Sequence, residues 1–169
     1  MTDMRAVIRC DAGPRVGLGH LIRCVSLSHA LSRKGIEIVF VMRDGDNAAK
    51  YIRHLSPFQP TLLPRSGSGD ESAALDAEDA TTVLTMAGDD GLIVVDHYGA
   101  DAVYLNCLSN ARARLVVLDD LGDRDLSAAD WIVNPGPQAD AIDYRIAQKT
   151  RCLLGPSYAL LRPEFREAR

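Results

Sequence analysis

The sequence lacks the features that mark membrane-spanning and nucleic-acid-binding proteins. No stretch of its 169 residues approaches the run of about 18 apolar residues that a membrane-spanning helix needs. Its 19 basic side chains are outnumbered by 23 acidic ones, and the formal net charge of −4 gives no positive surface for a phosphate backbone. We therefore expect neither nucleic acid nor a membrane among its partners.

The sequence is also poor in cysteine motifs. Its four cysteines lie far apart and form no C-x-x-C pair, so neither a disulfide framework nor a zinc site is expected. The N-terminal residues do not have the layout of a signal peptide, and no repeat or low-complexity tract is present. These absences predict a cytoplasmic domain with reduced thiols, long enough to bury a core.

Short apolar runs alternate with longer segments of helical periodicity, a pattern typical of βαβ units and a parallel sheet. The strongest strand patterns are the predominantly apolar runs at residues 36–42, 92–96 and 115–119. This alternation predicts an α/β fold of the Rossmann-like type, an open parallel sheet with helices on both faces. We expect strands over residues 5–10, 36–42, 61–63, 92–96, 115–119, 131–134 and 152–154, helices over 19–34, 47–55, 70–86 and 101–110, and a flexible loop over 65–69.

Polar side chains follow four of the predicted strands directly. They are Asp11, the run Asp96-His97-Tyr98, the pair Asp119-Asp120, and Asn134. The carboxyl ends of parallel strands line the ligand crevice of an open sheet, so the group as a whole indicates a functional site. Any single member could instead be a helix cap or a turn former. The carboxylates and the histidine would also suit Mg²⁺ or Mn²⁺, but no H-x-x-x-H or D-x-D motif accompanies them, and no metal or other cofactor is predicted.

A glycine-rich turn follows the first predicted strand, with the sequence DAGPRVGLGHLIRC over residues 11–24. Glycines let the backbone turn sharply and approach a ligand, and the amides at the start of the following helix can face that ligand. Ile22 stands where a dinucleotide-binding fingerprint has its third glycine, and the Gly-Lys-Ser/Thr of a Walker loop is missing. Binding of NAD or ATP is therefore not predicted.

His20 lies directly after Gly19 at the start of this predicted helix. The helix dipole and burial both disfavour the imidazolium there, so a neutral imidazole near physiological pH could accept a proton from water. The alternative is a histidine that hydrogen-bonds its own loop, and the sequence leaves both interpretations open. His97 is the next candidate histidine, because it follows the end of a predicted strand.

Taken in order along the chain, these motifs resemble a known family. They comprise Arg9-x-Asp11, Gly17-x-Gly19-His20-x-x-Arg23-Cys24, Asp96-His97-Tyr98-Gly99, Asp119-Asp120, Asn134 and the segment GPSYALLRPEF over residues 155–165. The family consists of the UDP-2,4-diacetamido-2,4,6-trideoxy-β-L-altropyranose hydrolases of pseudaminic acid biosynthesis and related spore-coat polysaccharide proteins. Its fold is similar to that of the two-domain GT-B glycosyltransferases, in which two Rossmann-like halves enclose a cleft.

The resemblance implies a reaction and a set of site residues. His20 would act as the general base on a water that attacks the anomeric carbon of a UDP-sugar, releasing UDP with inversion and without a metal. Tyr98 and Asn134 would contact the sugar. The other residues expected on the substrate side are Gly17, Gly19 and Asp11, and those expected in supporting positions are Arg9, Arg23, Asp96 and His97.

The resemblance also implies a domain organisation. Residues 1–154 would form the Rossmann-like N-terminal domain with the glycine–histidine turn, and residues 155–169 would begin the segment that leads to a C-terminal UDP-binding domain. The 169-residue chain would then be a catalytic half with little hydrolysis alone. Two alternatives stay open: the acceptor-binding half of a GT-B glycosyltransferase, and a non-catalytic module that binds a nucleotide sugar or a partner.

Overall fold

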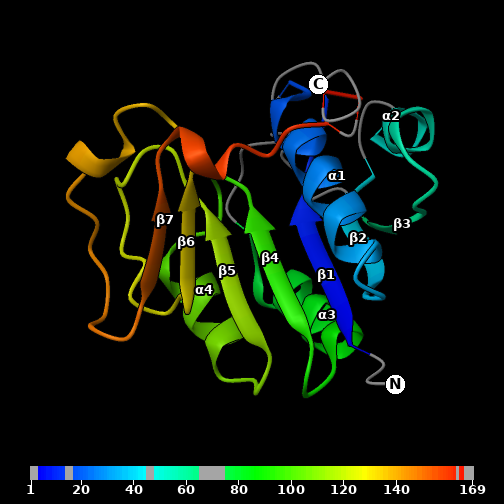
Figure 1. Ribbon diagram of the computed structural model, residues 1–169. Coiled ribbons are helices and arrows are strands. Elements are labelled where there is room, and N and C mark those ends of the chain that lie inside the picture. Colours follow the sequence, from blue (N-terminus) through cyan, green and yellow to red (C-terminus); the bar gives the residue numbers. More distant parts are fainter. Residues whose placement is uncertain (1–3, 14–16, 45–47, 65–74, 163, 166–169) are drawn as a thin grey trace.

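The computed structural model describes residues 4–13, 17–44, 48–64, 75–162 and 164–165. Seven strands form one parallel sheet in the order β3-β2-β1-β4-β5-β6-β7 (Figure 1). This architecture confirms the predicted α/β, Rossmann-like open sheet. The strands are β1 (Arg5–Cys10), β2 (Glu37–Arg43), β3 (Pro60–Leu63), β4 (Leu92–Asp96), β5 (Arg114–Leu118), β6 (Trp131–Asn134) and β7 (Arg151–Leu154).

Helices cover both faces of the sheet. On one face, α1 (Gly19–Ser32) and α2 (Ala48–Leu55) pack over the strands through a core that includes Leu21, Phe40 and Ile52. On the other face, α3 (Ala77–Ala87) and α4 (Ala102–Ser109) enclose a second core (Figure 1). Apart from Arg9 and Asp96, the buried side chains of β1, β4 and β5 are apolar on both faces, as expected for central strands of a parallel sheet.

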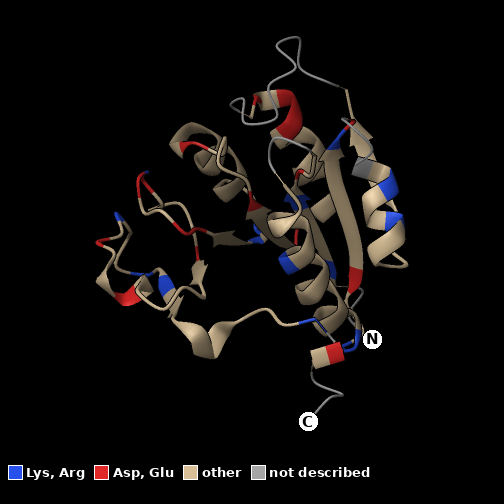
Figure 2. Cartoon of the chain, turned by 90° about the horizontal axis from the view of Figure 1, so that it is seen from above, with Lys and Arg blue, Asp and Glu red and all other residues tan. Residues whose placement is uncertain are grey.

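The strand order places a topological switch point between β1 and β4. From β1 the chain builds outward to β2 and β3 on one side, and it then returns to place β4 on the other side of β1. In open α/β sheets, ligands bind at the carboxyl ends of the strands beside such a switch point. Seen from the carboxyl ends of the strands, acidic and basic residues both lie near the centre of the molecule (Figure 2).

Most predicted elements differ from the observed ones only at their ends, but the third helix begins later than expected. The prediction placed it over residues 70–86, whereas α3 begins at Ala77. The side chain of Asp76 accepts a hydrogen bond from the backbone N–H of Asp79 at 2.9 Å and so caps the helix. The predicted loop over 65–69 and residues 70–74 lie outside the described residues.

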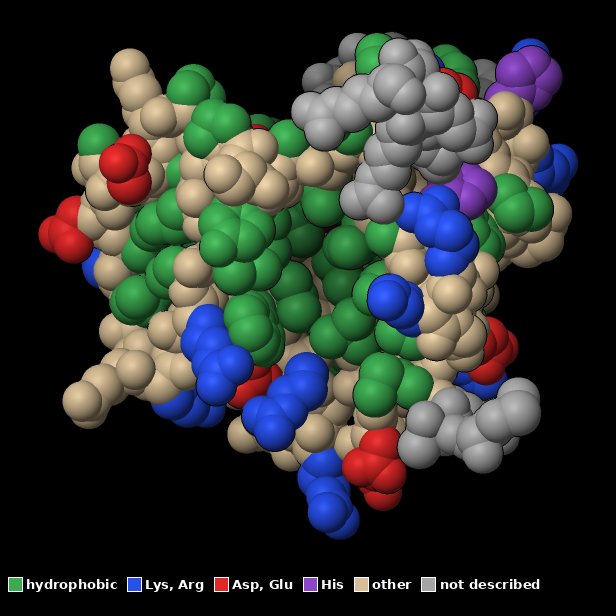
Figure 3. All heavy atoms as spheres, viewed as in Figure 1, with side chains coloured by type: hydrophobic (Ala, Val, Ile, Leu, Met, Phe, Trp, Pro, Cys, Tyr) green, Lys and Arg blue, Asp and Glu red, His purple; other side chains and the backbone are tan. Residues whose placement is uncertain are grey.

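The face that carries α1 is incompletely covered over β4 to β7. The connections over residues 119–130 and 135–150 contain no α-helix, only the short 3₁₀ turn η1 (Ala139–Ala141). Hydrophobic side chains therefore line a hollow on this face, among them Val116, Trp131 and Leu153 (Figure 3). Within the described part of the chain, no helix has the length and apolar character needed to cross a membrane.

Candidate functional site

The turn after β1 brings the chain from the carboxyl end of that strand into α1. Gly17 adopts a φ of 78°, a conformation that favours glycine, and its N–H donates to the carbonyl of Gly13 at 2.7 Å. Helix α1 then begins at Gly19, and no side chain caps its first turn. A Cβ atom built at Gly17 or Gly19 would meet no atom of the described residues within 4 Å, so both glycines border open space among them.

His20, in the first turn of α1, pairs with Asp96 at the end of β4. The atoms Nδ1 of His20 and Oδ1 of Asp96 lie 2.5 Å apart, and both residues are buried. An ionised carboxylate can only accept hydrogen bonds, so Nδ1 carries the proton and donates it. The other ring nitrogen, Nε2, is then unprotonated in the neutral imidazole and has a lone pair that can take a proton.

Asp96 is held in its ionised form by further donors from the same helix. Arg23 donates to it twice, from Nε to Oδ2 and from Nη2 to Oδ1, each at 2.5 Å, and the thiol of Cys24 lies 3.4 Å from Oδ2. Residues three and four apart lie on one face of a helix, which is why His20, Arg23 and Cys24 reach one carboxylate. Burial alone would raise the pKa of Asp96, but hydrogen bonds from Arg23 and His20 outweigh it and hold that pKa below its ordinary value.

Arg23 also links the Asp96 site to the loop that follows β5. Its Nη1 lies 2.8 Å from both carboxylate oxygens of Asp120. Burial opposes the charge of Arg23, yet its contacts with Asp96 and Asp120 raise its pKa further above the ordinary value. The guanidinium is therefore a fixed positive charge between two carboxylates.

Tyr98 lies over the ring of His20. The ring centroids are 4.7 Å apart and the rings meet edge to face, while Tyr98 stays 47% exposed. Burial and then the nearby Asp120 raise the pKa of the phenol, which keeps it a neutral hydroxyl that can donate to a ligand. The structure thus brings His20, Asp96, Arg23 and Tyr98 together.

Three other predicted residues belong to a separate, buried network on the other face of the sheet. Asp11 accepts hydrogen bonds from Nη1 of Arg9 at 2.7 Å and from Nε2 of His97 at 3.0 Å. Arg9 is fully buried and also binds Asp79 of α3, which in turn accepts from the hydroxyl of Tyr104 at 2.7 Å. Burial would raise the pKa of Asp11, but His97 and Arg9 lower it well below its ordinary range. These contacts hold Asp11, the first residue of the turn after β1, in place.

His97 differs from His20 in that both of its ring nitrogens are engaged. The backbone N–H of Gly99 donates to Nδ1 at 2.9 Å, so the proton lies on Nε2, which donates to Asp11. Burial lowers the pKa of His97, and the positive charges of Arg9 and Arg43 lower it further. His97 is therefore a neutral structural histidine that fixes the turn after β4.

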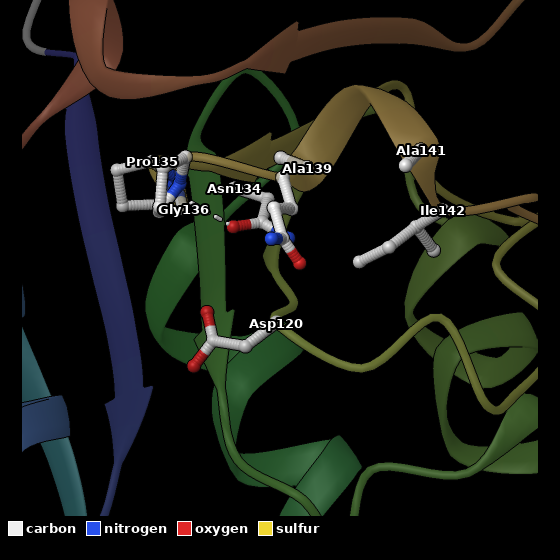
Figure 4. A pocket seen from close by; sticks show the side chains of 9 residues that line it. Asp120, Asn134, Pro135, Gly136, Ala139, Ala141 and Ile142 are labelled. Atoms are coloured by element: carbon white, nitrogen blue, oxygen red, sulfur yellow. Dashed lines mark hydrogen bonds between the residues drawn. The ribbon is translucent and has the colours of Figure 1, made fainter.

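Asn134, at the end of β6, lines a groove (Figure 4), and its side chain is hydrogen-bonded to residues other than His20. Its Oδ1 accepts from the N–H of Gly136 and its Nδ2 donates to the hydroxyl of Tyr144, each at 2.8 Å. The hydroxyl of Tyr144 donates in turn to the carbonyl of Asp119 at 3.1 Å. Both polar atoms of the Asn134 side-chain amide are thus hydrogen-bonded within the chain. The predicted contact of Asn134 with a sugar stays a prediction.

Sequence reasoning missed several residues that hold the site together. Arg124 donates to the carbonyls of His97 and Tyr98 at 3.0 and 2.9 Å, and its Nη2 lies 2.8 Å from Oδ2 of Asp119. Asp79 and Tyr104 complete the network around Arg9. No local motif points to these residues, because each acts through a partner that is distant in the sequence.

The carboxylates at the strand ends pair with arginines. Among the residues that the structure describes, no group of three or more His, Cys, Asp and Glu is disposed to hold a metal ion. The pairs are Asp11 with Arg9, Asp96 with Arg23, Asp119 with Arg124, and Asp120 with Arg23.

Comparisons with known proteins add no further information. No family model matches the chain, and neither the curated proteins nor the solved structures give a match. The function is therefore argued from the geometry of the site and from the motifs of the sequence.

Proposed function

We propose that this chain carries the water-activating site of a hydrolase that cleaves a UDP-linked 2,4-diacetamido-2,4,6-trideoxy sugar. The observation that carries the proposal is the pair formed by Nδ1 of His20 and Oδ1 of Asp96. The pair fixes the tautomer of the imidazole and leaves Nε2 as a base. The order of the motifs along the sequence, which resembles the pseudaminic acid family, supplies the substrate class.

In the proposed reaction, a water oxygen forms a bond to the anomeric carbon as the bond from that carbon to the diphosphate oxygen breaks. Nε2 of His20 takes a proton from the water, and the diphosphate oxygen keeps the electron pair of the broken bond. Attack on the face opposite the leaving group inverts the anomeric carbon. The ionised Asp96 stabilises the imidazolium that forms, and Arg23 keeps Asp96 ionised.

The surroundings of His20 support binding of a sugar beside it. Open space at Gly17 and Gly19 admits a ligand close to the backbone, and the uncapped first turn of α1 offers N–H donors. The half-exposed Tyr98 provides an apolar ring and a neutral hydroxyl, a combination that suits one face of a sugar ring.

The test follows free UDP by chromatography after incubation with the UDP-linked diacetamido sugar. It uses the 169-residue chain and any longer product of the same reading frame, because the resemblance assigns the nucleotide to a second domain. We expect a product that includes the second domain to release UDP without an acceptor, the 169-residue chain alone to release little, and His20→Ala to reduce the release by about 10²-fold or more. His54→Ala, at an exposed histidine of α2, is the matched control and should keep the activity.

The outcomes separate the alternatives. UDP release that survives His20→Ala contradicts the role of His20 as general base. Release that requires an added sugar acceptor identifies a glycosyltransferase, in which the same base acts on a hydroxyl. Tight binding of the UDP-sugar without any release identifies a non-catalytic module.

A further inference from the structure

We propose that the groove beside Asp120 and Asn134 binds an acetamido group of the sugar, an inference that rests on the proposed function. The groove lies at the carboxyl ends of β5 and β6 and has a volume of about 640 Å³. Small-molecule sites typically measure about 300–1,000 Å³, so the groove can hold a substituted sugar ring or a large part of one. Figure 4 shows Ile142 directed toward its open centre, whereas the carboxylate of Asp120, at the edge of the groove, points away from Ile142.

The chemistry of the groove favours a neutral ligand. None of its nine described lining residues is a lysine or an arginine, and the only charged one is Asp120. The lining therefore offers a diphosphate no lysine or arginine of its own, and the one nearby cation, Arg23, is already paired with the carboxylate of Asp120. The groove is therefore suited to the sugar part of a nucleotide sugar.

The lining matches the parts of an acetamido group. Such a group presents a methyl, an N–H donor and a carbonyl acceptor. Ala139, Ala141 and Ile142 form an apolar surface for the methyl, and Gln138 offers an amide that can donate to the carbonyl. Asp120 accepts from Arg23, but a carboxylate can accept about four hydrogen bonds, so it retains capacity for the ligand N–H.

The wall of the groove is held in place before any ligand binds. The bonds of Asn134 to Gly136 and Tyr144 fix the backbone where β6 ends, and Tyr144 ties that point to the loop after β5. A Cβ atom at Gly136 would lie 2.9 Å from Oδ1 of Asn134, so a glycine is required there for this contact. Asn134 thus acts by shaping the groove, and Asp120 acts directly.

Arg23 joins the groove to the proposed base. The same guanidinium binds Asp96, which orients His20, and Asp120, which lines the groove. Arg23 therefore fixes the position of Asp120 relative to Asp96 and His20. A sugar whose acetamido group binds to Asp120 would for this reason have a defined position relative to His20. This arrangement assigns recognition of the acetamido group to the same domain as the base.

The first test titrates N-acetylglucosamine and glucose into ¹⁵N-labelled protein and follows the amide resonances by NMR. We expect N-acetylglucosamine to shift the resonances of Gly136, Gln138 and Ile142, and glucose to leave them unchanged. Ala141→Trp fills the groove from an exposed position and should weaken the binding about tenfold or more, the effect of losing one good contact. Ala77→Trp, at an exposed alanine of α3, is its matched control and should not weaken it.

The second test measures KM for UDP release with Gln138→Ala and, as its matched control, Gln148→Ala at an exposed position outside the groove. A rise in KM for Gln138→Ala alone supports the proposal.

If the wild type releases UDP but neither the shifts nor KM depend on the groove, the groove assignment is overturned and the proposed function stands. If N-acetylglucosamine binds in the groove but no form of the protein releases UDP, the proposed function fails and the groove assignment stands. Absence of both overturns both.

Discussion

At the scale of single residues, two histidines near the switch point have opposite roles because their ring nitrogens have different partners. His20 donates from Nδ1 to Asp96, which leaves Nε2 available as a base. His97 accepts from Gly99 and donates to Asp11, so neither of its nitrogens is available. The sequence identified both as candidates and placed His20 first, but only the hydrogen-bond partners separate a base from a structural histidine.

The substitution Asp96→Asn tests the hydrogen bond between His20 and Asp96. In the wild type we expect the neutral His20 to carry its proton on Nδ1, observed in the ¹⁵N chemical shifts of the ring. An asparagine amide facing Arg23 would disturb the pair, so the variant should lose this tautomer preference and slow UDP release by up to as much as His20→Ala does, about 10²-fold or more, because Asp96 acts through His20. The ring signals of His97 serve as the internal control. A wild-type His20 with its proton on Nε2 would contradict the assignment.

At the scale of elements, the site is built by one βα turn and the neighbouring strand. The sequence predicted the strands, the glycine turn and the polar residues after each strand, because these depend on local patterns. It did not predict that β4 lies beside β1, since strand order is set by packing across the whole sheet. That neighbour relation is what brings Asp96 to His20, so the pair was beyond prediction from the sequence although both members were identified.

Alanine substitutions at Gly17 and Gly19 separate the conformational role of a glycine in this turn from its role in admitting a ligand. Gly17 has a φ of 78°, so Gly17→Ala should lower the free energy of unfolding by about 1–2 kcal/mol in urea titrations. Gly19 opens α1 with no positive φ and open space at its Cβ position, so Gly19→Ala should leave stability unchanged or slightly raised. If the open space admits the ligand, Gly19→Ala should nevertheless reduce UDP release. Full activity in Gly19→Ala would show that the ligand does not approach this backbone.

At the scale of the whole molecule, a buried network of charges lies between the sheet and α3, on the face opposite α1. Arg9 lies within an apolar strand and was expected only to support the turn, but it is fully buried and bridges Asp11 to Asp79 in α3. The sequence could not identify this pairing, because residues 9 and 79 meet only once α3 packs on the sheet. Removing one partner from such a buried pair is costly, since the other charge is left without compensation.

The same network makes the stability of the molecule depend on pH in the mildly acidic range. His97 is buried as a neutral ring among Arg9, Arg43 and Asp11, and its pKa is lowered. As the pH falls below about 6.5, the unfolded chain binds a proton at this histidine while the folded chain does not, so the free energy of unfolding decreases. The slope approaches about 1.4 kcal/mol per pH unit until the lower, folded-state pKa is passed. Below about pH 4, Asp11 and Asp96, whose pKa values are lowered, add a further loss.

Urea unfolding of the wild type and of His97→Gln at pH 8, 6 and 5 measures this contribution. The variant should be less stable at pH 8, because it loses the contact with Gly99, but its stability should fall less than that of the wild type between pH 6 and 5. His54→Gln changes an exposed histidine and should keep the wild-type slope. Equal slopes in the wild type and in His97→Gln would mean that His97 is charged in the folded protein, and its hydrogen bond from Gly99 would then have to be absent, since a protonated Nδ1 cannot accept one.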